Sequence, residues 1–322
     1  MFHFDLNDPF VVERVPSTIL LGLVCGFVAL YFTRSMNAFE QVFAKCKNMM
    51  VRFALGASVL AALIFLFPPL YGEGYSTIST LLNSHGMSDA SSVMNNSLFY
   101  GHDQYLLVFL ALVALVKVFA STATTGGGGC GGTFAPSIFL GGVTGFVFAG
   151  VWNLVQPFGI ILPTTNATLY GMAAVMSAVF HAPLTGIFLI AELTGGYQLL
   201  VPLMIVSSVS YSLVRSIEPH SIYAMRLARR GQLLSHHKDQ AVIALMNLDD
   251  VIDKTRPVLD PETSLGDMLQ IVSSSKRLHF AVCSPDGALL GQINLNNIRH
   301  IIFRSELYNT FTVRGLMSQP SA

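Results

Sequence analysis

Charged residues almost disappear from one long stretch of this sequence. Between Gln104 and Val214, the Lys, Arg, Asp and Glu residues are limited to Lys117 and Glu192. An ordinary soluble domain carries roughly 25% of such residues, whereas this chain of 322 residues carries 11% and is 52% hydrophobic. Because uncharged apolar segments of this extent are stable inside a lipid bilayer, we expect an integral, multi-pass membrane protein surrounded by membrane lipids.

Gly and Pro residues divide the hydrophobic part of the chain into short segments. Several fall below the about 20 residues that a helix needs to cross a membrane. Short, interrupted segments are typical of helices that end partway through the membrane beside a binding site. We therefore predict an all-α polytopic membrane domain with broken or re-entrant helices over residues 1–230. Its apolar segments are residues 17–33, 53–67, 105–120, 137–152, 168–180, 184–193 and 199–214.

Basic residues indicate on which side of the membrane each connection lies. The loop of residues 83–103 contains no Lys or Arg, whereas the predicted connection Arg34–Arg52 also contains Lys45 and Lys47. By the positive-inside rule, we expect the loop outside and the basic connection on the cytoplasmic side. The basic residues after the last apolar segment predict a cytoplasmic location for the C-terminal part of the chain; they are Arg226, Arg229 and Arg230.

A glycine-rich segment, Gly126–Gly132, leads into an apolar run that we expect to form a helix. Pro136 suits the first turn, where no backbone N–H is needed. A helix start has unpartnered N–H groups and a partial positive charge, so inside a membrane it forms an anion site without a buried cation. We predict such a site at Gly131, Gly132, Ala135 and Pro136. The alternative is a crossing point for close helix packing; a nucleotide P-loop is excluded because its lysine is missing.

Four polar side chains beside the apolar segments each allow two interpretations. Glu192 either relays protons or caps a helix end, and the neighbouring Gly residues favour the structural role. Lys117 either attracts anions or extends to the inner membrane interface, with no preference between the two. His181 is interpreted as a hydrogen-bonded structural residue rather than a proton carrier. Tyr223 either donates its hydroxyl to an anion or belongs to the interfacial aromatic belt, and the residues alone favour the belt.

The composition of the last part of the chain is that of a soluble domain. We predict a linker at residues 231–246 and a small α+β domain at residues 247–311. Within it, strands are expected at residues 258–259, 279–283 and 288–293, with helices after Ser264 and over residues 294–303. Residues 312–322 resemble the segment just before this α+β domain and predict the start of a second, truncated copy of it.

The remaining composition excludes several classes of protein. The net charge of +0 argues against a nucleic-acid binder. The four cysteines form no CxxC pair, so neither a zinc site nor a disulfide framework is indicated. A carrier of divalent cations would need clustered intramembrane carboxylates, and Glu192 stands alone. We expect no enzymatic activity, no catalytic residue, no metal and no cofactor in the membrane part.

Several motifs resemble those of one family in both order and spacing. Gly132-Thr133-Phe134-Ala135-Pro136 is similar to the GxFxP region of the CLC chloride channels and proton-coupled chloride exchangers. Gly72-Glu73-Gly74-Tyr75, Leu184–Phe188 with Glu192-Leu193-Thr194, and Ser221-Ile222-Tyr223 fall in the same order as in that family. The resemblance covers residues 1–230, and the soluble part resembles a CBS domain.

The resemblance implies a function for specific residues. It implies that the backbone N–H groups of Thr133 and Phe134 and the hydroxyl of Tyr223 bind chloride, which reverses the interpretation of Tyr223. It also implies chloride transport, a homodimer with an interface in the segment Pro183–Leu200, and a cytoplasmic CBS part.

Two loops of the family do not occur in this sequence, the GSGIP-type anion loop and the GxEGP loop with its gating glutamate. The sequence therefore resembles the C-terminal half of the CLC membrane domain, followed by one CBS unit and a stub, and we expect a fragment. Channel and exchanger stay undecided because the deciding glutamates are not in this chain. The alternative function is a membrane-anchored CBS module that senses adenine nucleotides, which requires an intact CBS pair.

Overall fold

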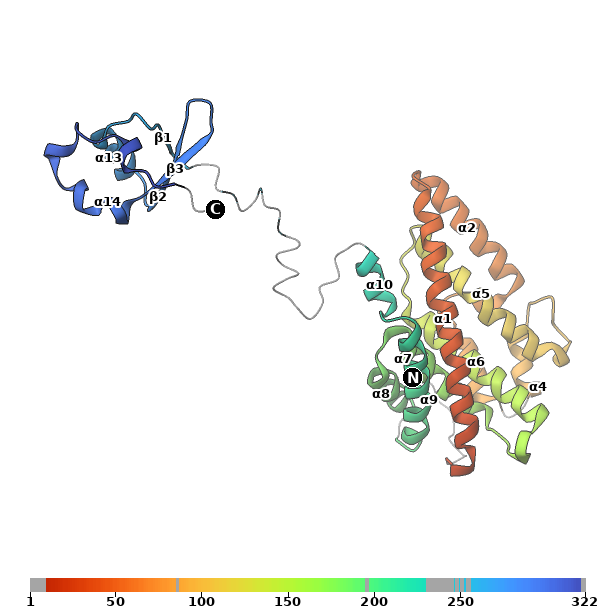
Figure 1. The fold of residues 1–322 in the computed structure, drawn as a ribbon. Coiled ribbons are helices and arrows are strands. Elements are labelled where there is room, and N and C mark those ends of the chain that lie inside the picture. Colours follow the sequence, from red (N-terminus) through yellow and green to blue (C-terminus); the bar gives the residue numbers. More distant parts are fainter. Residues whose placement is uncertain are drawn as a thin grey trace. The chain divides into compact units, whose positions relative to one another are not determined.

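A computed structural model describes residues 10–84, 87–194, 197–229, 246, 249, 252 and 256–319. The chain divides into two compact units, Met1–Leu233 and Leu234–Ala322 (Figure 1). The predicted linker, residues 231–246, lies outside the described residues except for Met246.

The described part of the first unit is helical, as the pattern of apolar segments predicts. Five of its helices are long and apolar enough to cross a membrane, whereas α3 and α8 are short. The helices are α1 (Val15–Lys45), α2 (Met49–Leu66), α3 (Tyr75–Asn83), α4 (Met87–Ala90), α5 (Leu106–Gly126), α6 (Phe134–Val155), α7 (Thr164–Phe180), α8 (Pro183–Leu193), α9 (Leu200–Ile217) and α10 (Ile222–Arg229), with short 3-10 turns at Val12–Arg14, Pro68–Leu70, Ser91–Met94, Asp103–Tyr105 and Pro157–Gly159.

The predicted basic connection Arg34–Arg52 is wrong in its extent. Helix α1 continues to Lys45 without a break, and only residues 46–48 separate it from α2. The charged residues of this stretch do not interrupt the helix, because Met36 and Phe43 still bury apolar surface along one side of it. The side chain of Asn48 then caps α2 by accepting a hydrogen bond from the N–H of Met50 at 3.0 Å.

Helix α7 lies at the centre of the first unit and is buried on every side from Asn166 to Val179. It packs against α1, α6, α8 and α9. Its closest neighbour is α6, and glycines make the approach possible: a Cβ atom at Gly145 would collide with the carbonyl oxygen of Ala167, and one at Gly171 with that of Gly141. The middle of α6 is therefore held by backbone-to-backbone packing against α7, which leaves little room for α6 to move.

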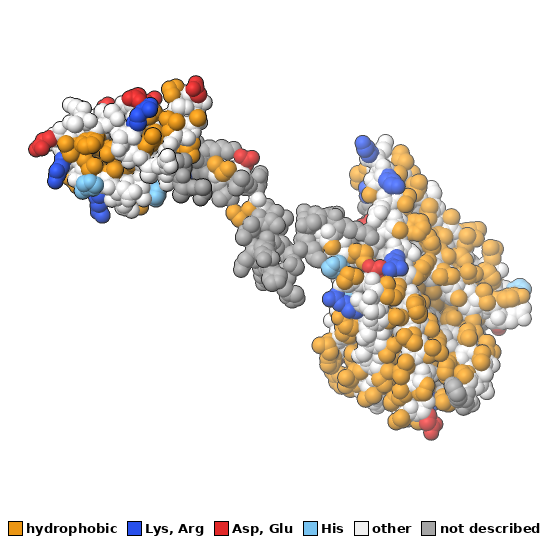
Figure 2. Space-filling view, viewed as in Figure 1, with side chains coloured by type: hydrophobic (Ala, Val, Ile, Leu, Met, Phe, Trp, Pro, Cys, Tyr) orange, Lys and Arg blue, Asp and Glu red, His pale blue; other side chains and the backbone are white. Residues whose placement is uncertain are grey.

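Apolar side chains cover much of the outer surface of the first unit, as the face in Figure 2 shows. Helix α2 is the clearest case, since Phe53 and Phe65 are exposed and Gly56 is its one buried residue. Such a surface suits a hydrocarbon environment rather than water.

The second unit is a small α+β domain whose elements lie close to the predicted positions. Its sheet has the order β1-β2-β3, with β1 parallel to β2 and β2 antiparallel to β3. The side chain of Ser264 caps α13, accepting from the N–H of Asp267 at 3.2 Å. The elements are β1 (Val258–Leu259), α13 (Leu265–Ser273), β2 (His279–Cys283), β3 (Leu289–Asn294), α14 (Leu295–Ile302), a 3-10 turn at Ser305–Leu307 and α15 (Val313–Leu316).

The segment predicted to begin a second copy packs onto the same unit. Val313 is fully buried in the core of this unit, and Ser318 pairs with Gln292 of β3. Whether this domain is of the CBS type stays a prediction.

We predict that Gly145→Val destabilises the protein. The added side chain must push α6 away from α7 at the carbonyl of Ala167, and overpacking of a dense core costs about 1–3 kcal/mol. The measurement is the thermal unfolding midpoint of the purified protein in detergent. The control is Ala61→Val on exposed α2, which should leave the midpoint unchanged; equal midpoints for the two variants would contradict the close packing.

Candidate anion-binding site

Glycines allow the chain to turn sharply between α5 and α6. Helix α5 ends at Gly126, and the N–H of Gly129 donates to the carbonyl of Thr124 at 2.8 Å. Gly128 has a φ of +97°, a conformation that side chains other than glycine rarely adopt. Gly127 also contacts the backbone of α2 at Gly56. The same glycines therefore serve the turn and close packing, which was the alternative to an anion site.

Helix α6 begins at Phe134, two residues before Pro136, with Thr133 as its N-cap. The carbonyl of Thr133 accepts the first hydrogen bond of the helix, from the N–H of Ser137 at 3.1 Å. Among the described residues, the N–H groups of Thr133 and Phe134 donate to no backbone or side-chain acceptor. They are the unsatisfied donors expected at a helix start, and the partial positive charge of the helix dipole adds to them.

Tyr223 lies against this helix start, although it is distant in the sequence. Its hydroxyl oxygen is 2.8 Å from Oγ1 of Thr133, and either oxygen can be the donor. Phe180 is the last residue of α7, and its ring contacts the rings of both Tyr223 and Phe134. The centroid of the Phe180 ring is 5.5 Å from that of Tyr223 and 6.1 Å from that of Phe134. The structure thus brings together α6, α7 and α10 at one point.

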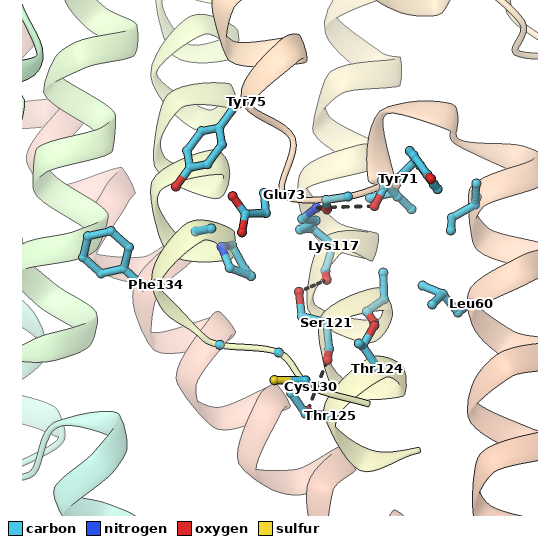
Figure 3. A pocket seen from close by; sticks show the side chains of 18 residues that line it. Leu60, Tyr71, Glu73, Tyr75, Lys117, Ser121, Thr124, Thr125, Cys130 and Phe134 are labelled. Carbon is cyan, nitrogen blue, oxygen red and sulfur yellow. Dashed lines mark hydrogen bonds between the residues drawn. The ribbon is translucent and has the colours of Figure 1, made fainter. Parts of the chain in front are cut away.

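A cavity of about 500 Å³ opens beside the start of α6 (Figure 3). The predicted residues Gly131, Gly132, Ala135 and Pro136 all line it, together with the side chain of Phe134. Its other lining residues are Leu60, Ile64, Leu70, Tyr71, Gly72, Glu73, Tyr75, Lys117, Ala120, Ser121, Thr124, Thr125 and Cys130.

The hydroxyl groups on the α5 side of the cavity are already used as donors. Ser121, Thr124 and Thr125 each donate to a carbonyl one turn earlier in their own helix, at 2.9, 3.0 and 3.2 Å. A hydroxyl has one proton and two lone pairs, so these side chains offer acceptors to the cavity. These three α5 hydroxyls therefore supply no donor to an anion, whereas the main chain at the start of α6 has donors without a partner.

Lys117 is enclosed within the unit, with 2% of its surface exposed. Its Nζ atom donates to the carbonyl oxygens of Gly72 at 3.2 Å and Leu70 at 3.4 Å, and it lies 4.6 Å from the centre of the Phe139 ring. Figure 3 shows the Glu73 side chain between Lys117 and Tyr75. The Lys117 side chain thus connects α5, the segment before α3 and α6. It does not extend to the surface, as snorkelling to the interface would require.

Glu192 lies apart from this group, at the end of α8. Its carboxylate is exposed and accepts a hydrogen bond from the hydroxyl of Tyr197 at 2.7 Å, which raises the pKa of Tyr197. The predicted capping of backbone N–H groups is not among the contacts of the described residues, and Gly195 and Gly196 lie outside them. His181 ends α7 in a left-handed conformation and packs against the ring of Tyr211, in keeping with a structural role.

Comparison with known proteins shows which family this chain resembles. Residues 1–215 match the family model described as voltage gated chloride channel.

The chain belongs to the CLC chloride-channel family. It is therefore an integral, multi-pass membrane protein, in agreement with its five long apolar helices.

Curated proteins that are similar to this chain carry the names of chloride channels. The chain is 31% identical over 216 residues to the voltage-gated ClC-type chloride channel ClcB of Escherichia coli O17:K52:H18, which covers 67% of this chain and 46% of that protein. It is 30% identical over 232 residues to ClcB of Escherichia coli O9:H4, covering 72% of this chain and 51% of that protein. The CLC chain spans about half the length of the curated relatives it matches.

Solved structures share the fold. A CLC-type fluoride/proton antiporter has a TM-score of 0.51 at 22% identity, over 69% of this chain and 49% of that one. A eukaryotic CLC transporter has a TM-score of 0.52 at 17% identity, over 95% of this chain and 54% of that one. At these identities the likeness establishes the fold alone.

Sequence reasoning found the helix start but missed two features around it. The carbonyl groups that hold Lys117 carry no sequence signal, because any residue supplies a carbonyl. The hydroxyl contact between Thr133 and Tyr223 joins two distant segments, and no pattern within either segment indicates it.

We predict that Lys117→Met destabilises the first unit and that Lys117→Arg largely preserves it. Loss of the ammonium group leaves the carbonyls of Leu70 and Gly72 without their donor, at a cost of about 1–3 kcal/mol. The thermal unfolding midpoint in detergent measures this. Lys45→Met, at the exposed end of α1, is the control. A midpoint for Lys117→Met equal to that of the control would show that the contacts do not stabilise the fold.

Proposed function

We propose that this CLC chain transports chloride across a membrane, as part of a channel or a proton-coupled exchanger. The observation that carries the proposal is the start of α6, where the N–H groups of Thr133 and Phe134 have no acceptor among the described residues. Unpaired donors inside a membrane are costly, and an anion satisfies them. The names of the ClcB relatives, as chloride channels, support the same substrate.

Neutral donors suit transport better than a cation would. A Lys or Arg that contacted the ion directly would hold it strongly, whereas amide and hydroxyl groups bind an anion and still release it. Lys117 is consistent with this division, since its ammonium group is occupied by carbonyl oxygens. We infer that its charge contributes at a distance rather than by contact.

The hydroxyl pair has one arrangement that suits an anion. If Thr133 donates to the oxygen of Tyr223, the proton of Tyr223 remains available, and the phenol can donate to the ion. In this arrangement the ligands of chloride are the N–H groups of Thr133 and Phe134 and the hydroxyl of Tyr223. Tyr223 is 49% exposed within the unit, and the contact between its hydroxyl and Thr133 is partly buried.

The assembly and the second unit complete the proposal. We infer a homodimer, with the segment Pro183–Leu200 in its interface, and a cytoplasmic domain of the CBS type after α10. The 95% coverage of this chain by the eukaryotic CLC transporter, which extends beyond the membrane helices, supports the second inference. The adenine-nucleotide alternative stays a prediction, because no described contact in the second unit favours it.

We predict that Tyr223→Phe weakens chloride binding by about threefold to tenfold, since one hydrogen bond contributes about 0.5–1.5 kcal/mol. The experiment reconstitutes the full natural protein in liposomes, follows chloride efflux with an electrode and measures chloride affinity by calorimetry. Tyr31→Phe is the matched control, because the hydroxyl of Tyr31 donates to the carbonyl of Leu115, away from the site.

Two results would contradict the proposal. One is a wild-type protein that neither binds nor transports chloride. The other is chloride flux that survives rearrangement of the sequence Gly132–Pro136. Proton movement against chloride in the same liposomes separates an exchanger from a channel.

A further inference from the structure

The C-terminal part of α1 reaches the segment that carries Tyr223. Nε of Arg34 lies 2.7 Å from Oε1 of Glu218, and Nδ2 of Asn37 donates to Sδ of Met225 at 3.1 Å. Glu218 precedes Tyr223 in the sequence and Met225 comes after it. The two contacts of α1 therefore bracket the tyrosine on both sides.

The length of α1 explains how it makes these contacts. Its 31 residues extend about 46 Å at 1.5 Å per residue, whereas the hydrocarbon core of a bilayer is about 30 Å thick. The additional turns are those that carry Arg34 and Asn37, and they are not needed to cross the membrane. They lie instead beside the connection between α9 and α10.

The bracketed segment also has contacts of its own. Helix α9 ends at Ile217, Glu218 is extended, and Arg215 donates to the carbonyl of Pro219. Ser221 then starts α10, and Ile222 is fully buried. Arg215 is thus bonded to a carbonyl of the connection, while Glu218 forms its ion pair with Arg34.

The opposite side of Tyr223 is fixed by the site itself. Its hydroxyl meets Thr133 at 2.8 Å, and its ring lies against Phe180. Tyr223 therefore lies between the rigid pair of α6 and α7 and the connection that α1 holds. A shift of that connection would change the position of the hydroxyl relative to the start of α6.

We propose that Arg34 and Glu218 are positioning residues that set the place of the Tyr223 hydroxyl at the anion site. This inference rests on the proposed function, chloride binding at the start of α6. The pair acts through geometry rather than through stability. Arg34 is 60% exposed and Glu218 19%, and ion pairs of this kind contribute little to folding. The ion pair matters for Tyr223 because it holds the connection between α9 and α10 in one position.

The test is a charge swap in the reconstituted full-length protein. Arg34→Glu and Glu218→Arg should each weaken the apparent chloride affinity by about threefold to tenfold, the range expected for a misplaced hydrogen-bond donor. The double variant with both changes restores an ion pair with opposite polarity and should return the affinity to within about twofold of wild type. Maximal flux at saturating chloride should change less than the affinity.

Arg314→Glu is the matched control, because Arg314 forms a comparable exposed ion pair with Glu262 in the second unit, at 2.8 Å. It should leave chloride affinity unchanged. Thermal unfolding midpoints identify variants that fail to fold. If a charge-reversal variant does not fold, Arg34→Gln or Glu218→Gln is measured in its place.

The outcomes separate this inference from the function on which it rests. A wild-type protein without chloride binding or flux removes the proposed function. A wild type that binds and transports chloride, with single variants of unchanged affinity, overturns the positioning role alone. Single variants that the double variant does not rescue overturn it as well, since the loss would then come from each residue separately. The positioning role is supported if each single variant has a weakened chloride affinity and the double variant regains the affinity of the wild type.

Discussion

The first unit depends on one constraint: backbone N–H groups inside a bilayer need partners, because no water is present to supply them. A continuous helix satisfies this internally except at its ends. In this chain, α6 begins at Phe134 while α5 ends eight residues earlier at Gly126, so the start of α6 lies beside a cavity. The unsatisfied amides of Thr133 and Phe134 result from that placement.

Holding such an end in place requires a rigid surrounding. Helix α7 supplies the centre, and the glycines at its contact with α6 let the two backbones pack directly against each other. Lys117 adds a second connection, from α5 to the segment before α3 and to the ring of Phe139. A buried ammonium is expensive in apolar surroundings, and here carbonyl dipoles and an aromatic face compensate for it.

Much of the architecture of the first unit could be predicted from the sequence. The run of nearly uncharged residues predicted the helical membrane unit, and Gly126–Gly132 followed by Pro136 predicted the helix start that lines the cavity. Tyr223 could be assigned only through the family resemblance, because its partner Thr133 is far away in the chain. The extension of α1 was missed because Arg34 and Lys45 suggested a loop, whereas burial of Met36 and Phe43 keeps the helix intact. Tertiary packing, which no local pattern contains, decided both cases.

The hydroxyl groups along α5 lead to a further consequence for the cavity. Because Ser121, Thr124 and Thr125 donate back into their own helix, that wall presents oxygen lone pairs, while the facing helix start presents hydrogens. The two groups of polar atoms therefore lie on different parts of a largely apolar lining and carry partial charges of opposite sign. An anion that entered the cavity would be attracted to the start of α6, whereas the hydroxyl oxygens of α5 would attract a cation.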